Sequence, residues 1–288
     1  MMSVDRVHRF ILTICCENRP GLVADIGQSV FELGGDIIEL HQFDDEDRQK
    51  FFCRLVFDCD AQAETIEPEL RDSLGARGLS WQLQPEEGRL RVVVLLSKQD
   101  HCLNELLYQQ HTGSLKINIV AIASNHPYEA LSIPQIGDIP FFYLPVTAET
   151  KKVQEARIKK LCRDAEADLV ILARYMQILS DDLVAFLEGR CINIHHSFLP
   201  GFKGAKPYHQ AYARGVKMIG ATAHYVTADL DEGPIIAQDV ESVSHADLSH
   251  DLVRKGREIE RRVLTRAVQS HADYRVFKNG NRTVVFQR

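Results

Sequence analysis

Three polar residues in the C-terminal part of the chain have side chains that together could carry out acyl transfer. Asn193 and His195 alternate within the short apolar run CINIH, and Asp231 lies in the acidic turn DLDEG. Alternate residues of a strand point to the same face, so Asn193 and His195 would share one side of it. A carboxamide can stabilise the oxyanion of a tetrahedral intermediate, an imidazole can move protons, and a carboxylate can orient the imidazole. These side chains indicate transfer or hydrolysis of an acyl group.

Strands and helices alternate along the C-terminal two-thirds of the chain and would carry these residues. The strand segments are nearly continuous runs of Val, Ile and Leu, which is typical of an open, mostly parallel α/β sheet covered on both faces. The strands are expected at 91–97, 116–124, 139–145, 168–173, 191–194, 217–226 and 234–238, and the helices at 101–110, 150–166 and 248–269. Ligands of such sheets bind beyond the carboxyl ends of the strands. An Asn-Gly pair in the tail predicts a final hairpin at the sheet edge.

The first 84 residues predict a separate, smaller α+β domain. They read as a strand, a helix, two strands, a second helix and a short strand around Trp81. A polar stretch with Pro and Gly, residues 85–89, follows and is the expected linker. The expected domains are therefore 1–84 and 90–288.

The composition excludes several classes of protein. With a net charge of -6 and no long basic run, the chain lacks the electrostatic footprint of a nucleic-acid-binding protein. Its apolar runs are far shorter than the roughly 20 residues that cross a bilayer, and its N-terminus has no secretory signal pattern. Seven scattered cysteines, with no CxxC pair and no Cys/His ligand spacing, predict reduced thiols and no metal site. We expect a cytoplasmic protein with neither a membrane nor a nucleic-acid partner.

The segments around the three polar residues resemble a known family, although each residue taken singly has an ordinary structural explanation. NIHHSFLPGFKG and DEGPIIAQ resemble the signature of the formyltransferase domain, over about residues 90–275. Glycinamide ribonucleotide formyltransferase, methionyl-tRNA formyltransferase and formyltetrahydrofolate deformylase share this domain. The resemblance implies a Rossmann-like fold, 10-formyltetrahydrofolate as substrate and no permanently bound cofactor. It also places Asn193, His195 and Asp231 at the family's catalytic positions.

The same resemblance implies where a folate would bind. The segment ARYMQILS resembles the loop whose backbone holds the pterin ring, and the segment that ends at Asp231 resembles the loop that closes over it. The implied folate-binding residues are Met176, Gln177, Ile178, Leu179, Val226 and Asp229. Thr222 and His224, on the preceding strand, are expected to support the catalytic side chains.

The N-terminal segment ENRPGLVADIGQSVFELGGDIIEL resembles the opening of an ACT domain, a ferredoxin-like module. Such modules typically pair across a dimer and bind amino acids at the interface, so a homo-oligomer, a dimer or a tetramer, is expected. A glycine at the Pro-Gly turn would let a small ligand approach the start of the helix. The implied effector residues are Asn18, Pro20, Gly21 and Leu22, with Asn18 standing where the family often has Asp. A dimerisation domain without a ligand is the alternative.

Two departures favour water as the formyl acceptor. The turn SKQDHCLNEL lacks the glycines with which the ribonucleotide-dependent transformylase holds a phosphate. We also expect no RNA-binding domain of the kind that follows the catalytic domain of methionyl-tRNA formyltransferase. An ACT module fused to a formyltransferase domain resembles the formyltetrahydrofolate deformylases. This resemblance predicts hydrolysis to formate and tetrahydrofolate, which would supply formate and balance one-carbon pools for purine biosynthesis. Formyl transfer to an amine, and a non-catalytic sensor of amino acids or folate, are the alternatives.

Overall fold

The computed structural model describes residues 7–132, 136–199 and 207–288. The chain forms two compact units: the first comprises 1–88, 273–279 and 284–288, and the second comprises 89–272 and 280–283. The break after Gly88 falls inside the polar stretch expected to be the linker. The C-terminal part differs from the expected domain 90–288, because most of the tail groups with the first unit. In the described part of the chain, no helix is long and apolar enough to cross a membrane.

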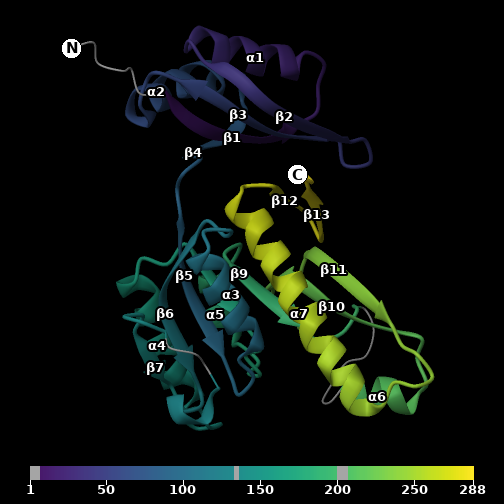
Figure 1. Ribbon diagram of the computed structural model, residues 1–288. Helices are drawn as coiled ribbons and strands as arrows, with labels where there is room; N and C mark the ends of the chain where they lie inside the picture. Colours follow the sequence, from purple (N-terminus) through teal and green to yellow (C-terminus); the bar gives the residue numbers. More distant parts are fainter. Residues whose placement is uncertain (1–6, 133–135, 200–206) are drawn as a thin grey trace. The chain divides into compact units, whose positions relative to one another are not determined.

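The first unit is built on an antiparallel sheet with its helices on one face (Figure 1). Its elements are β1 (His8–Glu17), α1 (Leu22–Glu32), β2 (Asp36–Asp45), β3 (Lys50–Cys59), α2 (Ala63–Ser73), the 3-10 helix η1 (Gly75–Arg77) and β4 (Ser80–Pro85). The strand order β2-β3-β1-β4 is the expected ferredoxin-like arrangement. Alternate residues of β1 and β3 point to the helices and form the core with them. The paired core residues are Phe10 with Phe57, Leu12 with Leu55, and Ile14 with Cys53.

The tail forms the predicted hairpin but not at the predicted place. Strands β12 (Val276–Asn279) and β13 (Arg282–Val285) make a two-stranded sheet of their own. Phe277 and Phe286 pack against Phe52 of β3, and the Arg54 guanidinium donates to the backbone oxygen of Asp273 at 3.0 Å. The expectation that this hairpin joins the edge of the larger sheet was therefore wrong, because its aromatic residues bury against the first unit instead.

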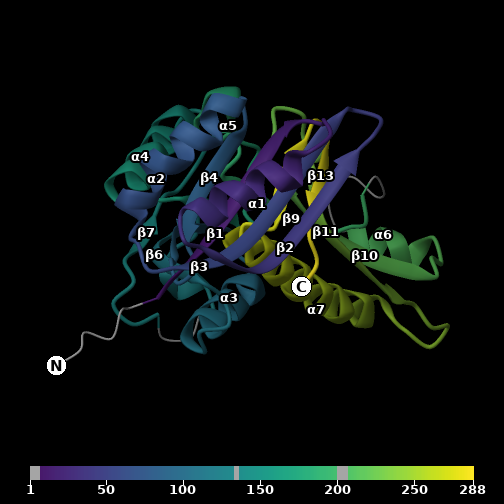
Figure 2. The same cartoon turned by 90° about the horizontal axis from the view of Figure 1, so that it is seen from above.

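The second unit is a mostly parallel sheet with helices on both faces. Its first half comprises β5 (Leu90–Leu96), α3 (His101–His111), β6 (Ile117–Ser124), the 3-10 helix η2 (Tyr128–Ala130), β7 (Phe141–Tyr143), α4 (Lys151–Asp164) and β8 (Leu169–Leu172). Its second half comprises α5 (Asp181–Phe186), β9 (Cys191–His195), α6 (Pro207–Ala213), β10 (Met218–Tyr225), β11 (Ile235–Ser242) and α7 (Ser249–Ala272). The helices α4 and α5 share one core cluster with the sheet, whereas α7 lies along β9, β10 and β11 and packs on α3 (Figure 2).

The strand order β11-β10-β9-β8-β5-β6-β7 explains where a site can form. From β5 the chain first proceeds to β6 and β7 on one side, and later places β8 and β9 on the other. Strands β5 to β9 run parallel to one another, and β10 runs antiparallel to both of its neighbours, β9 and β11. Between β5 and β8 the order in which the chain adds strands reverses, so the loops that follow these two strands leave the sheet in opposite directions. A crevice opens there, beyond the carboxyl ends of the strands.

Candidate active site

A cavity of about 330 Å³ lies beyond the carboxyl ends of β8 and β9. Three segments line it: the loop after β8, the end of β9, and the turn that joins β10 to β11. The predicted residues that line it are Asn193, His195, Asp231, His224, Met176, Gln177, Ile178, Leu179, Val226 and Asp229. The fold therefore brings the predicted catalytic and folate-binding residues together around one cavity.

Thr222, predicted to support the catalytic side chains, does not line this cavity. It is fully buried, and its hydroxyl accepts a hydrogen bond from the Leu199 backbone at 3.0 Å and donates one to the Ser197 oxygen at 3.0 Å. Gln238 donates to the same hydroxyl at 2.9 Å. Thr222 thus fixes the chain that leaves β9 and acts on the cavity only through that chain.

The pairing of β9 with β10 sets the positions of Asn193 and His195. Ile192 and Ile194, which alternate with them, are buried, so the two polar side chains share the other face of the strand. In the antiparallel ladder Asn193 lies opposite His224, and its Nδ2 atom is 3.2 Å from the Nε2 atom of His224. The side chains that face each other across this strand pair therefore form one polar cluster.

The turn after β10 presents Asp231 through an unusual backbone geometry. Asp231 has a positive φ of 57°, a conformation that an Asp adopts more readily than most residues. Two residues later, a Cβ at Gly233 would lie 1.8 Å from the backbone oxygen of Tyr225, so only glycine fits there. The motif DEG therefore folds the turn tightly against the end of β10 and directs the carboxylate to the cavity.

The carboxylate of Asp231 lies between two imidazoles. Its Oδ1 atom is 3.2 Å from Nδ1 of His195 and 3.8 Å from Nε2 of His224. Burial alone would raise the pKa of Asp231, but its contact with the neighbouring imidazoles, that of His195 first, outweighs burial and holds that pKa well below its ordinary value. Asp231 is therefore an anion that accepts the Nδ1 proton of His195. The Nε2 atom of His195 is buried and has no hydrogen-bond partner within the described residues, so its lone pair is available to take a proton.

The hydrogen bonds of His224 determine how Asn193 is oriented. The Nδ1 atom of His224 is 2.9 Å from the backbone oxygen of Tyr225, and it must donate, because a carbonyl oxygen can only accept. The Nε2 atom of a neutral His224 then carries the lone pair and accepts from the amide of Asn193. This bond uses one amide hydrogen and leaves the other free for a ligand oxygen.

His196 also lines the cavity, although strand alternation would turn it to the opposite face from His195. Strand alternation does not apply to His196, because β9 ends at His195, and the two imidazole rings lie tilted with centroids 5.2 Å apart. Burial and the positive charge of Arg174 lower the pKa of His196 to about 3. His196 is therefore a neutral wall of the cavity at physiological pH.

We expect His196 to make the protein less stable in acid. In the unfolded chain the pKa of His196 returns to about 6.5. Between that pH and about pH 3 the unfolded state therefore binds a proton that the folded state does not bind, and this favours unfolding. Between about pH 7.5 and about pH 5 this costs about 2 kcal/mol of the free energy of unfolding. Urea unfolding at the two pH values measures this loss of stability. The loss should be smaller by about 2 kcal/mol in His196→Gln than in the unchanged protein. In His250→Gln, whose side chain is exposed, it should equal that of the unchanged protein. Equal losses in all three proteins would contradict the assignment.

Known proteins similar to this chain identify its family. Residues 90–268 match the family model described as formyl transferase. The chain belongs to the formyltransferase family. It is 44% identical to a formyltetrahydrofolate deformylase of Corynebacterium sp. (strain P-1), over 97% of this chain and 98% of that protein. It is also similar to the crystal structure of a formyltetrahydrofolate deformylase from Burkholderia mallei, with a TM-score of 0.89, 45% identity and coverage of 97% of this chain and 100% of the other.

Other members of the formyltransferase family match a smaller part of the chain. A glycinamide ribonucleotide transformylase from Symbiobacterium toebii has a TM-score of 0.63 and 27% identity, and it covers 69% of this chain and 95% of its own. The deformylase matches span both units, whereas this match leaves about a third of the chain uncovered. The matches that cover nearly the whole chain are therefore to deformylases, whereas the transformylase match covers about two thirds of it.

A buried network in the formyltransferase unit was not found by sequence reasoning. Glu260 of α7 is 1% exposed, and its Oε1 atom accepts from the Tyr208 hydroxyl at 2.7 Å. Its Oε2 atom is 2.7 Å from Nε2 of His101 and 3.4 Å from Nε of Arg174. A Cβ at Gly256 would lie 2.1 Å from the Tyr208 ring, so this glycine lets the ring approach α7. The available signal was a charged residue on the otherwise apolar face of the helix.

Arg174 connects this network to the predicted folate loop. It lines the cavity and has a positive φ of 66°. Its backbone oxygen accepts from the Ser97 amide at 3.1 Å, and the Ser97 hydroxyl accepts from the Met176 amide at 2.9 Å. Burial alone would raise the pKa of Glu260, but the hydrogen bond of His101 and the charge of Arg174 lower it. The ionised Glu260 therefore holds Arg174 at the start of the loop.

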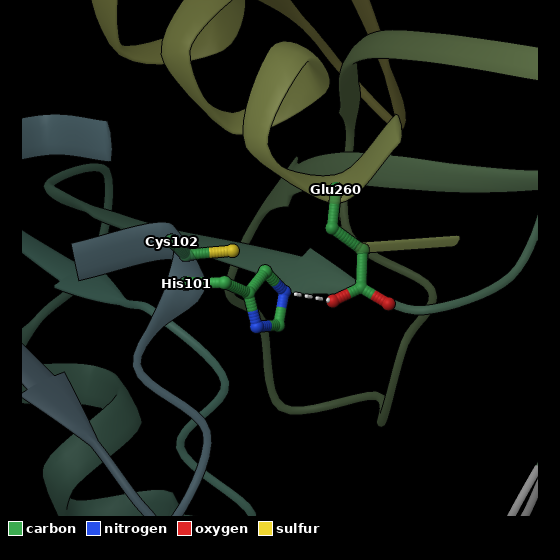
Figure 3. A group of neighbouring side chains, drawn as sticks. All are labelled: His101, Cys102 and Glu260. Carbon is green, nitrogen blue, oxygen red and sulfur yellow. Dashed lines mark hydrogen bonds and ion pairs between the residues drawn. The ribbon is translucent and has the colours of Figure 1, made fainter. Parts of the chain in front are cut away.

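Three members of this region, His101, Cys102 and Glu260, lie close enough to be considered as metal ligands (Figure 3). The carboxylate of Glu260 already accepts hydrogen bonds from His101 and Tyr208, and the Arg174 cation beside it would repel a metal ion. Burial raises the pKa of the Cys102 thiol well above its ordinary value, which disfavours the thiolate that metals bind. We interpret the group as a hydrogen-bond network.

The four residues predicted to bind an effector lie in the first unit, at the turn from β1 to α1. Gly21 precedes α1 with a φ of 90°, which only glycine adopts readily, and Pro20 is exposed. The Asn18 amide donates to the Gln49 backbone oxygen at 2.9 Å. Leu22 is 2% exposed and belongs to the hydrophobic core, so its side chain packs inward.

Proposed function

We propose that this chain hydrolyses 10-formyltetrahydrofolate to formate and tetrahydrofolate. The observation that carries the proposal is the convergence of Asn193, His195 and Asp231 on one cavity, with the His195 Nδ1 atom 3.2 Å from the Asp231 carboxylate. The full-length relatives named formyltetrahydrofolate deformylase support the same activity.

In the proposed reaction the three residues have separate roles. The lone pair on Nε2 of His195 accepts a proton from water as the water oxygen attacks the formyl carbon. Asp231 positions the water and stabilises the imidazolium that forms, and the free amide hydrogen of Asn193 bonds the developing oxyanion. The carbon to N10 bond then breaks, His195 returns the proton to N10, and formate leaves.

The walls of the cavity support a folate as the ligand. Met176, Ile178 and Leu230 line the cavity and are 54%, 63% and 57% exposed, so three large, exposed apolar side chains gather at one site. They offer an apolar surface to the flat pterin and benzoyl rings, while the backbone of residues 176–179 would hydrogen-bond the pterin edge. Val226 and Asp229 would close over the ring from the opposite wall.

Formate release from 10-formyltetrahydrofolate tests the proposal. We expect formate and tetrahydrofolate in equal amounts from the purified protein without added amine or metal. An assay with labelled donor and candidate amines separates hydrolysis from formyl transfer, because transfer would label the amine and leave formate unlabelled. Donor binding without turnover would indicate a sensor and overturn the proposal.

His224→Ala should lower kcat about tenfold by releasing the amide of Asn193 from its productive orientation. We expect the KM for the folate to change less than about threefold, since Asn193 acts on the oxyanion. His245→Ala, an exposed histidine outside the cavity, is the matched control. If kcat of the His224 variant equals that of the control, the orienting role is wrong.

The proposal extends to the setting of the enzyme. The Gly21 turn would bind an amino-acid effector in a homo-oligomer, and the formate would supply purine biosynthesis in the cytoplasm. All seven cysteines are free thiols, which agrees with a reducing compartment. Light scattering with and without a panel of amino acids tests the oligomer and the effector together.

A further inference from the structure

The second unit holds another cavity, of about 740 Å³, between α7, α6 and the start of α3. These helices pack on one another, since α7 contacts both α3 and α6. The residues of its lining that matter here are Arg254, Arg257, Arg261, Ser249, His101 and His209. We call it the cationic cavity. The proposed deformylase mechanism uses none of these lining residues.

Three arginines on α7 give the cavity its charge. Arg254, Arg257 and Arg261 stand three and four residues apart, so they share one face of the helix. Arg254 lies 3.6 Å from the carboxylates of Asp251 and Glu258. Arg257 and Arg261 make neither an ion pair nor a hydrogen bond with any residue that the structure describes. Glu258 also lines the cavity, beside Arg254, so two of the three arginines there have no carboxylate partner within the described residues and the site is positive on balance.

The opposite flank of the same helix shows what compensated arginines look like here. Arg262 and Arg266 both donate to the Oδ2 atom of Asp239, at 2.7 Å and 2.9 Å. The cationic cavity has no such shared carboxylate for Arg257 and Arg261 within the described part of the chain. In addition, the Ser249 hydroxyl at its wall is buried and has no hydrogen-bond partner there. An anion placed here could pair with Arg257 and Arg261 and accept a hydrogen bond from the Ser249 hydroxyl.

We propose that the cationic cavity binds a small molecule through a phosphate group. A phosphate carries nearly two negative charges and three strong acceptor oxygens, so it can bond two guanidinium groups and a hydroxyl at once. A carboxylate is already satisfied by a single arginine fork. The two unpaired guanidinium groups of Arg257 and Arg261, with the Ser249 hydroxyl, therefore match phosphate better. Because α7 supplies the cations, the site does not need the glycine turn that this chain lacks after β5.

The cationic cavity is distinct from the cavity of about 330 Å³ in which we propose that the folate binds, which we call the folate cavity. His101 lines the cationic cavity, Arg174 lines the folate cavity, and both contact the same oxygen of Glu260. Glu260 thus lies between residues of the two linings. A phosphate ligand can bind beside α7 without displacing the folate, and its binding does not depend on the proposed deformylase activity.

Isothermal titration of the full chain with inorganic phosphate and with glycerol 3-phosphate, at constant ionic strength, tests the proposal. We expect saturable binding of both, and binding weakened at least about tenfold in the double variant Arg257→Gln/Arg261→Gln. The matched control is Arg262→Gln/Arg266→Gln, which removes the same charge from the other flank of α7 and should bind within about twofold of the unchanged chain.

Several results would overturn the proposal. Absence of saturable binding up to about 10 mM would do so, and so would equal weakening in the two double variants, which would indicate a general charge effect. Glycerol 3-phosphate reports a phosphate ester and inorganic phosphate reports the free ion, so the tighter of the two identifies the source. If a γ-linked triglutamate binds and neither phosphate does, the cavity is a carboxylate site instead.

Discussion

Asp231→Asn should lower kcat for formate release by about 10²- to 10³-fold while the KM for 10-formyltetrahydrofolate stays within severalfold. The neutral amide keeps the size of the side chain but cannot stabilise a charged His195 across the 3.2 Å contact between Nδ1 and Oδ1. His195→Asn should lower kcat by a similar factor, because it removes the imidazole that accepts the proton from water. Single-turnover formate release, compared with steady-state rates, measures the chemical step itself.

The double variant should be no slower than the worse single variant, because residues that act as a unit lose their effect together. Glu232→Gln is the matched control, since it removes an exposed carboxylate from the same turn outside the cavity lining. It should retain nearly the full rate. An Asp231→Asn protein with more than about a third of the original kcat would remove Asp231 from the catalytic group.

Glu260→Ala should destabilise the protein by about 3 to 5 kcal/mol, the cost of leaving a buried charge without its partner. The variant leaves Arg174, which is 7% exposed, without the carboxylate that offsets its charge, and it also removes the acceptor of His101 and Tyr208. Urea unfolding followed by far-UV circular dichroism measures the effect. Fluorescence is less suitable because the single tryptophan, Trp81, belongs to the first unit.

Two further variants show whether the lost charge of Glu260 causes the destabilisation. Glu260→Gln keeps acceptor capacity but not the charge, so its loss should lie between that of Glu260→Ala and zero. Glu258→Ala, two residues away and 43% exposed, should change the free energy of unfolding by less than about 0.5 kcal/mol. Equal stabilities for the Glu258 and Glu260 variants would show that the network contributes nothing.

Local patterns in the sequence were sufficient for several parts of this protein. The Val, Ile and Leu runs predicted the strands of both units, and the two-residue alternation in CINIH placed Asn193 and His195 on one face. The Asn-Gly pair predicted the tail hairpin. Resemblance in two short segments pointed to residues that line the cavity beyond β8 and β9. These features depend on backbone geometry that repeats every two to four residues, so the sequence itself displays them.

Tertiary structure alone decided the features that depend on distant pairing. Asp231 reaches His195 because β10 pairs antiparallel with β9 and Gly233 folds the next turn back onto it. The hairpin belongs with the first unit because Phe277 packs against Phe52. The Asn-Gly turn predicts the hairpin but not this distant contact. The Glu260 network joins residues up to 159 positions apart in the sequence. Such contacts are set by how whole elements pack, and no spacing within a single element encodes them.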